Sequence, residues 1–537
     1  MVRSKRQAAA IILITVFLVA LTRGLTISHN LTISHNMELH SDEHVFFTAA
    51  QSLKGYLSGS SPVYEEVKEY PEGAIVFQLP FHILTAVINR LCSAGISPRL
   101  SGRIADVFYF TIGVALGGVI IYRFFSKKPV YTALYGLIAV FSLLHIEQSR
   151  YGTGDAISLF LLMSVVLLTA SGLSAEKRRG MHVAFAVFAA GAAGAVKYPL
   201  VIFAAIPAFA AVHLLRGAPR WRKLAAAAAF LAVLWLGFAV FSPKAALDPM
   251  YIYRASTREL GDYLGAAGLP LYLKLWSNFM SIFTYSMLYS GFPLMPLWLF
   301  LALRAAFREK TGGDGVRVLF CRVMPVMLIV FLSYNLLATF FAMRSFYPFF
   351  FLGDLYVAAA AGNWLQRGGA RRAAVLALSA FMVLRGAWLV GAMSARNDGA
   401  RMTALIESAV DDSWDKTTIL SGYIIFPDGL EDEKETTVVN ITDARFAGED
   451  AMRLAPGELF IAGARDFAIG GFQYNFLPKK YSVFASSTAW RSFAAVNEEY
   501  CVGRLYPQYY YYLFGYWLSG TTGTAFEFPT CTVYYRA

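Results

Sequence analysis

Long apolar segments alternate with short polar loops over the first 393 residues of the chain. Each segment holds about 16–25 residues, which is the length that crosses a bilayer as a helix. The pattern therefore predicts a multi-spanning α-helical membrane protein with about eleven transmembrane helices. The expected spans are 8–24, 104–122, 130–147, 155–172, 181–196, 199–215, 224–241, 281–303, 317–341, 346–364 and 373–393.

One further apolar segment, 73–92, has a different pattern because polar residues interrupt it. They are Gln78, Pro80, His82, Asn89 and Arg90. We predict an amphipathic helix that lies on the membrane surface.

Basic residues occur in every second loop, and this alternation predicts the topology. The basic loops are VRSKR at the start, YRFFSKK at 122–128, EKRR at 176–179, RGAPRWRK at 216–223, RAAFREK with Arg317, and QRGGARR at 366–372. Lys and Arg mark cytoplasmic loops, so the N-terminus is expected in the cytoplasm. The outward set is then 25–103, 148–154, Lys197, 242–275, 342–345 and all residues after 393. A cleaved signal peptide is the alternative for the first segment, but no small-residue cleavage site is evident.

The chain changes character near residue 394. Short β-rich runs separated by turn residues predict an extracytoplasmic α/β or α+β domain over 394–537. Cys501 and Cys531 lie in this region. A disulfide between them and two separate thiols are both compatible with an oxidising exterior.

Composition supports the membrane class. Apolar residues make up 57% of the chain and charged residues 15%, with a mean hydropathy of +0.50. A soluble chain would carry about a quarter charged residues. The net charge of +12 is explained by the basic loops of the predicted topology. We therefore expect membrane lipids as partners and no nucleic acid.

The carboxylate pair Asp42-Glu43 is the first candidate for chemistry. It lies in HSDEHVFFTAAQSL, just after the first apolar segment, on the predicted outer side of the membrane. Paired carboxylates next to a membrane surface indicate chemistry on a lipid-linked substrate.

Further charged residues lie at the same predicted boundary: Arg103, Arg150, Asp155, Lys197 and Arg344. A charge at the centre of a span costs about 2.5–3.5 kcal/mol. Near a span end, a side chain that snorkels to water is the plain alternative for Arg103 and Arg150. Asp155 opens a span within SRYGTGD, and Lys197 precedes the helix-breaking Pro199. Together these residues predict acidic and basic groups around one outward-facing pocket.

This set of residue types suits sugar transfer from a polyprenyl phosphate. Arg and Lys bind the phosphate and stabilise it as the leaving group. A carboxylate takes the proton of the acceptor hydroxyl or amine. A single displacement then inverts the anomeric carbon.

The order of motifs resembles the GT-C membrane glycosyltransferases, in particular glycosyltransferase family 39, the protein O-mannosyltransferases and the aminoarabinose transferases of lipid A. The resemblance covers about residues 1–420. The matching elements are Asp42-Glu43, EYPEGAIVFQLP, Arg103, SRYGTGD with Asp155, GAVKYP with Lys197, RSFYP with Arg344 and Pro348, and NDGARMTALIESAVDDSWDKTTIL. Two positions depart from the family pattern: Val196 replaces the usual Thr, and Pro71-Glu72 replaces Pro-Pro.

The resemblance implies a GT-C-like catalytic domain over 1–393 and assigns roles within it. It implies that Asp42 is the catalytic base and that Glu43 and Asp155 support the site. It also implies that Lys197, Arg344 and Arg103 hold the carrier phosphate, and we add Arg150 to this set. The outward loop 242–275 is expected to close over the substrates. Its candidate residues are Tyr251, Tyr253, Arg254 and Arg258.

No cofactor is certain from the sequence, and a divalent metal is left open. The aminoarabinose transferases have a metal site in their external loops. Here Glu65, Glu66, Glu69, Glu72 and His82 are candidate ligands, although their spacing does not demand a metal.

The expected function is transfer of a hexosyl or pentosyl group from a polyprenyl-phosphate donor to a protein, lipid or glycan acceptor outside the cytoplasm. The plasma or inner membrane is the expected location. A transporter or flippase is one alternative, but the inverted repeats and midplane charges expected of it were not found in the sequence. An oligosaccharyltransferase of the same broad fold is a second alternative, but its Trp-Trp-Asp motif is absent from the soluble domain. A non-catalytic binder of polyprenyl phosphates is the third, and the intact Asp42-Glu43 pair disfavours it.

Overall fold

The structure is a computed structural model of the 537-residue chain. It describes residues 2–28, 43–61, 72–248, 250, 253–254, 257, 271–288, 292–337, 343–395, 404–405, 415–421, 435–440, 453–462, 495–505 and 531–537. The chain divides into two compact units, and each is considered by itself. The first takes the described residues of 1–27, 45–266 and 286–390, and the second takes those of 28–44, 267–285 and 391–537.

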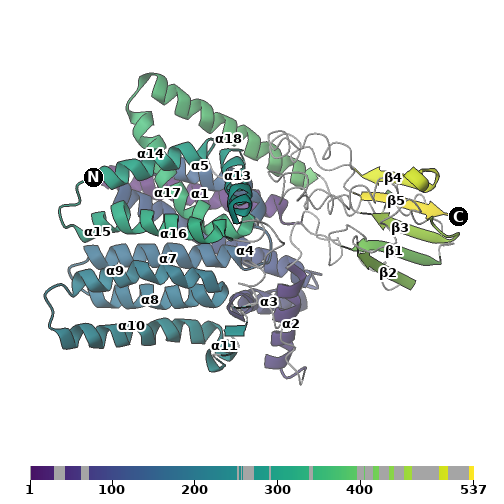
Figure 1. Cartoon of the computed structure of the whole chain (residues 1–537), viewed down its shortest axis with the longest axis horizontal. Helices are drawn as coiled ribbons and strands as arrows, with labels where there is room; N and C mark the ends of the chain where they lie inside the picture. The colour runs from purple at the N-terminus through teal and green to yellow at the C-terminus, as the bar shows by residue number, and fades with distance from the viewer. Residues whose placement is uncertain are drawn as a thin grey trace. The chain divides into compact units, whose positions relative to one another are not determined.

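The first unit is a helical bundle (Figure 1). Its elements up to residue 148 are α1 (Val2–Thr26), α2 (Glu43–Leu57), α3 (Glu72–Cys92), α4 (Pro98–Ile120), the π-helix η1 (Ile121–Phe125), α5 (Pro129–Phe141) and α6 (Leu143–Gln148). Then come α7 (Asp155–Ser174), α8 (Arg179–Val196), the 3₁₀ helix η2 (Tyr198–Ala204), α9 (Ala205–Leu214), α10 (Arg220–Phe241) and α11 (Pro243–Leu247). The last are α14 (Met295–Arg308), α15 (Gly315–Val318), the π-helix η3 (Leu319–Val323), α16 (Met324–Leu336), α17 (Met343–Gln366) and α18 (Gly369–Ala395).

Eight helices in the described part of the chain are long and apolar enough to cross a membrane. They are Ser4–Thr26, Glu72–Cys92, Pro98–Phe125, Asp155–Ser174, Arg179–Val196, Arg220–Phe241, Gly315–Leu336 and Gly369–Gly391. Two shorter apolar helices, Pro129–Phe141 and Tyr198–Leu214, coincide with further predicted spans. The mostly helical membrane fold predicted from the sequence is confirmed.

Two predicted spans differ from the structure. The span 281–303 is wrong as one helix, because α13 (Leu271–Leu288) ends and α14 begins only at Met295. Pro293 and the positive φ of Leu294 (63°) explain why the helix does not continue there. The span 130–147 also breaks, at Ser142, whose backbone is extended and whose side chain accepts a hydrogen bond from His145 N.

The segment 73–92 is helical as predicted, in α3. By length and composition α3 also qualifies as a membrane span. Its position on a membrane surface therefore stays a prediction.

The predicted cytoplasmic loops gather at one end of the bundle, which we call the basic end. Ser4 Oγ donates to Lys127 O at 2.7 Å, and Lys128 Nζ donates to Gln366 Oε1 at 2.5 Å. Gly315 lies next to His213, at the end of α9. Figure 1 shows the N-terminus, α15 and the loop between α9 and α10 at this end, with α2, α3 and α11 at the other. The structure thus reproduces the alternation of loops on which the topology prediction rests.

Helices α8 and α10 pack closely because each presents a glycine to the backbone of the other. Gly191 lies against the Leu234 carbonyl, and Gly237 lies against the Phe188 carbonyl. Small residues allow membrane helices to approach in this way. Leu224, Leu231, Trp235 and Leu236 are exposed on α10. An apolar outer surface of this kind is what a lipid-facing helix requires.

The second unit contains a five-stranded mixed sheet in the order β2-β1-β3-β5-β4. The strands are β1 (Lys416–Ser421), β2 (Glu435–Asn440), β3 (Glu458–Ala462), β4 (Cys501–Leu505) and β5 (Cys531–Arg536). Strand β1 is parallel to β2 and β3, and β5 is antiparallel to β3 and β4. A mixed sheet agrees with the strand-rich region expected after residue 394. The boundary at 394 and the extracytoplasmic position stay predictions.

The register of β4 and β5 decides between the two alternatives for the cysteines of this region. Cys501 lies opposite Tyr534, and Cys531 lies opposite Leu505. Three residues of strand, about 10 Å, thus separate the two cysteines along the ladder. A disulfide requires Cα atoms within about 7 Å, so the register disfavours a bond between Cys501 and Cys531.

Candidate functional site

Asp155 opens α7, at the end of the bundle opposite the basic end. Gly154 precedes it with φ +75°, a left-handed conformation that a residue with a side chain adopts only under strain. The buried carboxylate accepts a hydrogen bond from Thr153 Oγ1 at 2.9 Å. A negative charge in the first turn of a helix is stabilised by the helix dipole, so this position suits an ionised carboxylate. We call this end of the bundle the Asp155 end.

Lys197, a second candidate from the sequence, forms an ion pair with Asp155. It caps α8 in an extended conformation, and its ammonium contacts Asp155 Oδ1. The Lys197 side chain is 28% exposed, whereas that of Asp155 is 2% exposed. The pair therefore combines a buried carboxylate with an ammonium that reaches the surface of the bundle.

Arg103 and Arg150 are buried, so the snorkelling alternative for them is wrong. Arg103 donates from α4 to Ile27 O at 2.9 Å, beyond the end of α1. Arg150 lies over the ring of Tyr151, at 4.6 Å from its centroid, and donates to Tyr151 Oη at 2.9 Å. Both guanidinium groups thus contribute to the interior of the unit near the loop 149–154.

The buried carboxylate of Asp106 was missed by the sequence analysis. It lies one turn after Arg103 on α4, and its Oδ2 accepts a hydrogen bond from Thr153 N at 3.1 Å. Thr153 thus connects two carboxylates, because its hydroxyl donates to Asp155. Asp106 lies inside an expected span, and that position alone was a signal for function.

Several predicted residues lie outside what the structure describes. Asp42, Tyr251 and Arg258 are outside the described residues. Glu43 opens α2 and Arg344 lies in the first turn of α17, but their side chains are not described. Their predicted roles stay predictions.

The described part of the loop 242–275 shows exposed residues. Tyr253 is exposed, and Arg254 pairs with Asp248 at 2.9 Å, with both side chains exposed. An exposed pair of this kind contributes little to stability.

The candidate metal ligands that the structure describes, Glu72 and His82, do not lie close together. Glu72 opens α3 and accepts from Lys244 N at 3.1 Å, whereas His82 bonds Ser101. Ten residues of helix, about 15 Å, separate them. Glu65, Glu66 and Glu69 lie outside the described residues. Within the described part, no three His, Cys, Asp or Glu side chains lie close enough to hold a metal ion.

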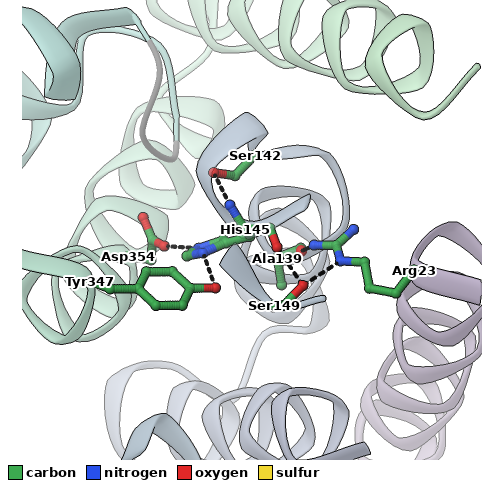
Figure 2. Close-up of polar contacts among 7 residues, drawn as sticks. All are labelled: Arg23, Ala139, Ser142, His145, Ser149, Tyr347 and Asp354. Carbon is green, nitrogen blue, oxygen red and sulfur yellow. Dashed lines mark hydrogen bonds and ion pairs between the residues drawn. The ribbon is translucent and has the colours of Figure 1, made fainter. Parts of the chain in front are cut away.

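A second buried polar cluster links α6 to α17 (Figure 2). His145 Nε2 lies 2.6 Å from Asp354 Oδ2, and His145 Nδ1 lies 3.2 Å from the Tyr347 hydroxyl. All three side chains are buried. Tyr347 belongs to the RSFYP element, so the cluster fixes α17 three residues after Arg344.

Arg23 extends this cluster to α1. Its guanidinium donates to Ser149 Oγ at 2.9 Å and to Ala139 O at 2.8 Å (Figure 2). It also donates to Val140 O at 2.7 Å. Ser149 in turn donates to His145 O at 2.5 Å. The break of the helix at Ser142 frees the carbonyls that Arg23 binds. The start of the loop 149–154 is thus held by α1 and α6.

His145 and Asp354 lie inside predicted spans, and an ionisable residue there is a functional candidate by default. The sequence analysis considered only the outward boundary and therefore missed them. The statement that the sequence shows no charges within the spans is therefore wrong for this pair.

Chemically, the Asp155 end offers an oriented ammonium next to a buried carboxylate. Such an ammonium binds a phosphate oxygen by a charge-assisted hydrogen bond. The loop 149–154 leads directly into Asp155. It is held by Asp106 through Thr153 N, by Arg23 through Ser149 Oγ, and by the start of α7. This arrangement suits an anionic ligand that reaches the Asp155 end.

The apolar helices and one solved structure together identify the fold: the chain is a multi-spanning helical protein with the GT-C fold, as the sequence analysis predicted. The chain is similar to an Archaeoglobus fulgidus oligosaccharyltransferase solved in complex with Zn and sulfate, with a TM-score of 0.50 and 12% sequence identity. The match covers 86% of this chain and 69% of that one. At this identity the match shows the fold alone.

Two further solved structures are similar with lower TM-scores. The first is oligosaccharyltransferase AglB of Archaeoglobus fulgidus in complex with an inhibitory peptide and a dolichol-phosphate, at TM-score 0.46 and 12% identity, covering 87% of this chain and 71% of that one. The second is ArnT of Cupriavidus metallidurans in the apo state, at TM-score 0.43 and 12% identity. That match covers 84% of this chain and 93% of ArnT. No protein-family model and no curated protein sequence matches the chain.

Proposed function

We propose that the protein is a membrane glycosyltransferase that takes a sugar from a polyprenyl-phosphate donor. The observation that carries the proposal is the Asp155–Lys197 pair on a GT-C fold. The buried carboxylate fixes the partly exposed ammonium in position. The ammonium can then bind the carrier phosphate and stabilise it as the leaving group.

In the proposed reaction, the acceptor hydroxyl or amine attacks the anomeric carbon. The bond between that carbon and the phosphate oxygen breaks, and its electron pair leaves with polyprenyl phosphate. Asp42 takes the proton of the acceptor, and the anomeric centre is inverted. Lys197, with Arg344, neutralises the charge on the departing phosphate. Arg103, Arg150 and Glu43 would shape the same site.

Several parts of this proposal stand on the sequence resemblance. They include the role of Asp42, the protein, lipid or glycan acceptor, and the extracytoplasmic position of the site. The described residues offer no metal site, and no step here passes through a metal.

The test is turnover of the purified protein in detergent with a panel of radiolabelled polyprenyl-phosphate sugars. Wild type should release free polyprenyl phosphate from at least one donor. Asp42→Asn should bind the same donor and release less than about one hundredth as much, since a positioned base contributes about 10²–10⁴-fold. Donor binding without release by wild type, with any acceptor tried, would indicate a binder or transporter instead.

A further inference from the structure

A buried polar spot with unsatisfied hydrogen-bonding groups lies between α3 and α4. Gln78 is 0% exposed and His82 is 4% exposed, one turn apart on α3. Both amide atoms of Gln78 and the Nε2 atom of His82 lack a hydrogen-bond partner among the described residues. A buried polar atom without a partner costs about 1–3 kcal/mol, so this arrangement calls for an explanation.

The hydroxyl of Ser101 lies within hydrogen-bond distance of two groups, Pro98 O at 2.7 Å and His82 Nδ1 at 2.6 Å. If its hydrogen goes to the carbonyl, His82 Nδ1 donates to it and Nε2 presents a lone pair. If its hydrogen goes to Nδ1, the ring carries its own hydrogen on Nε2. In both tautomers Nε2 requires a partner that the described residues do not supply.

Gly102 on α4 faces this spot and carries no side chain that would fill it. A Cβ atom at Gly102 would lie 3.8 Å from Gln78 Oε1 and 4.0 Å from His82 Nε2, and 3.7 Å from Gly152 Cα. All three are ordinary van der Waals distances, so a side chain at Gly102 would fill the position that Gln78 and His82 face. A hydroxyl at this position can donate its one hydrogen to Gln78 Oε1 and accept from His82 Nε2 in the tautomer that carries the ring hydrogen there.

The spot lies next to the Asp155–Lys197 pair. Gly152 belongs to the loop that ends at Asp155. Ala74, one turn of about 5.4 Å before Gln78 on α3, lies against Gly154. Gly154 also lies close to Val196, next to Lys197. A ligand whose phosphate binds Lys197 would therefore have the atoms next to its phosphate near this spot.

We propose that Gln78 and His82, above Gly102, form a subsite for one hydroxyl of the donor sugar. This inference rests on the proposed function and names the part of the donor that this face of α3 recognises. Gln78 and His82 are specificity residues in it. A site built to bond one hydroxyl discriminates against a sugar that lacks it, because the buried polar groups are then left unpaired.

Gly102→Ala is the sharpest variant because it fills the space with a methyl group and leaves every polar group in place. The contacts are ordinary, and alanine is the better helix former, so the fold should persist. Gln78→Leu is the second variant. It removes a buried unpaired amide and should leave thermal stability equal or higher, whereas a structural role would lower it. Gly180→Ala, on α8 with open space around it, is the matched control.

The experiment measures dissociation constants of the full chain in nanodiscs for polyprenyl-phosphate sugars, for sugar-free polyprenyl phosphate and for single-deoxy forms of the bound sugar. Gly102→Ala and Gln78→Leu should each weaken binding of the sugar-bearing lipid about tenfold or more. Binding of the sugar-free lipid should not change. One single-deoxy sugar should bind wild type as weakly as the complete sugar binds Gly102→Ala. The Gly102→Ala variant should bind the complete sugar and that deoxy sugar equally well.

Equal weakening of both lipids, or no change in either, would overturn the subsite and leave a buried water as the partner of Gln78 and His82. If wild type binds no sugar-bearing lipid but retains the sugar-free one, the donor of the proposed function is wrong and the subsite falls with it. These results are distinguishable, because the first two require donor binding by wild type.

Discussion

At the residue scale, Asp155 and Lys197 could each be selected as candidates because both residues interrupt apolar segments at the same predicted boundary. Their ion pair was not predicted. The residues that hold this pair in place could not be predicted from the sequence. Thr153 is an ordinary polar residue in the sequence. Asp106 could be noticed as a charge inside a span, but only the fold brings the loop 149–154 against it on α4. The burial of Arg103 and Arg150 was equally out of reach, since a span end is compatible with snorkelling or with an interior position.

Lys197→Met should lower the stability of the protein more than Asp155→Asn. The first change leaves a buried carboxylate without its cation, which costs about 3–5 kcal/mol. The second leaves the partly exposed ammonium, which can turn to water. The free energy of unfolding in mixed detergent micelles measures the difference. The reverse order of the two variants would contradict the buried position of Asp155.

Gly154→Ala should be destabilising by about 1–2 kcal/mol from backbone strain alone, because Gly154 is left-handed at φ +75°. A Cβ atom there would also lie 2.7 Å from Ala74 Cβ, so α3 would have to shift. Gly95→Ala is the control, since Gly95 has open space around it and no positive φ. Equal melting temperatures for the two variants would refute the close approach of α3 to the loop 149–154.

At the element scale, hydrophobic periodicity predicted most helices but not their breaks. Ser142 divides one expected span, and Pro293 with Leu294 divides another. Helix breaks depend on caps and backbone angles at single residues, and an apolar run conceals them. The break at Ser142 matters because it exposes the carbonyls that Arg23 binds and places His145 against α17.

The His145–Asp354 pair should couple α6 to α17. His145→Leu leaves the buried carboxylate of Asp354 unpaired and should cost about 3–5 kcal/mol. Replacing both residues by Leu removes the charge as well and should recover most of that loss. A double-mutant cycle on the free energy of unfolding gives the coupling. If the double variant is as unstable as the sum of the single ones, the two side chains do not interact.

At the scale of the whole molecule, the alternation of basic loops predicted which ends of the helices lie together. The hydrogen bonds of Ser4 and Lys128 at the basic end agree with it. The orientation, that is, which end faces the cytoplasm, stays a prediction from charge alone. The second unit was predictable only as a strand-rich region, because strand order and register depend on contacts between distant residues.

The topology can be tested with Cys92, which is exposed at the end of α3. A chain with Cys92 as the single cysteine should react with a membrane-impermeant maleimide in intact cells. A chain with Lys177→Cys as its single cysteine, at the basic end, should react only after permeabilisation. The opposite pattern would invert the orientation of the protein.

The central claim is that the Asp155 end holds the phosphate of a lipid-linked sugar. A cryo-electron microscopy structure with a non-hydrolysable phosphonate analogue of a polyprenyl-phosphate sugar tests it most directly. We predict the phosphonate within about 4 Å of Lys197 Nζ, the distance of an ion pair. A phosphonate bound at the basic end, or a Lys197 that contacts only Asp155 while the analogue occupies another site, would contradict the account.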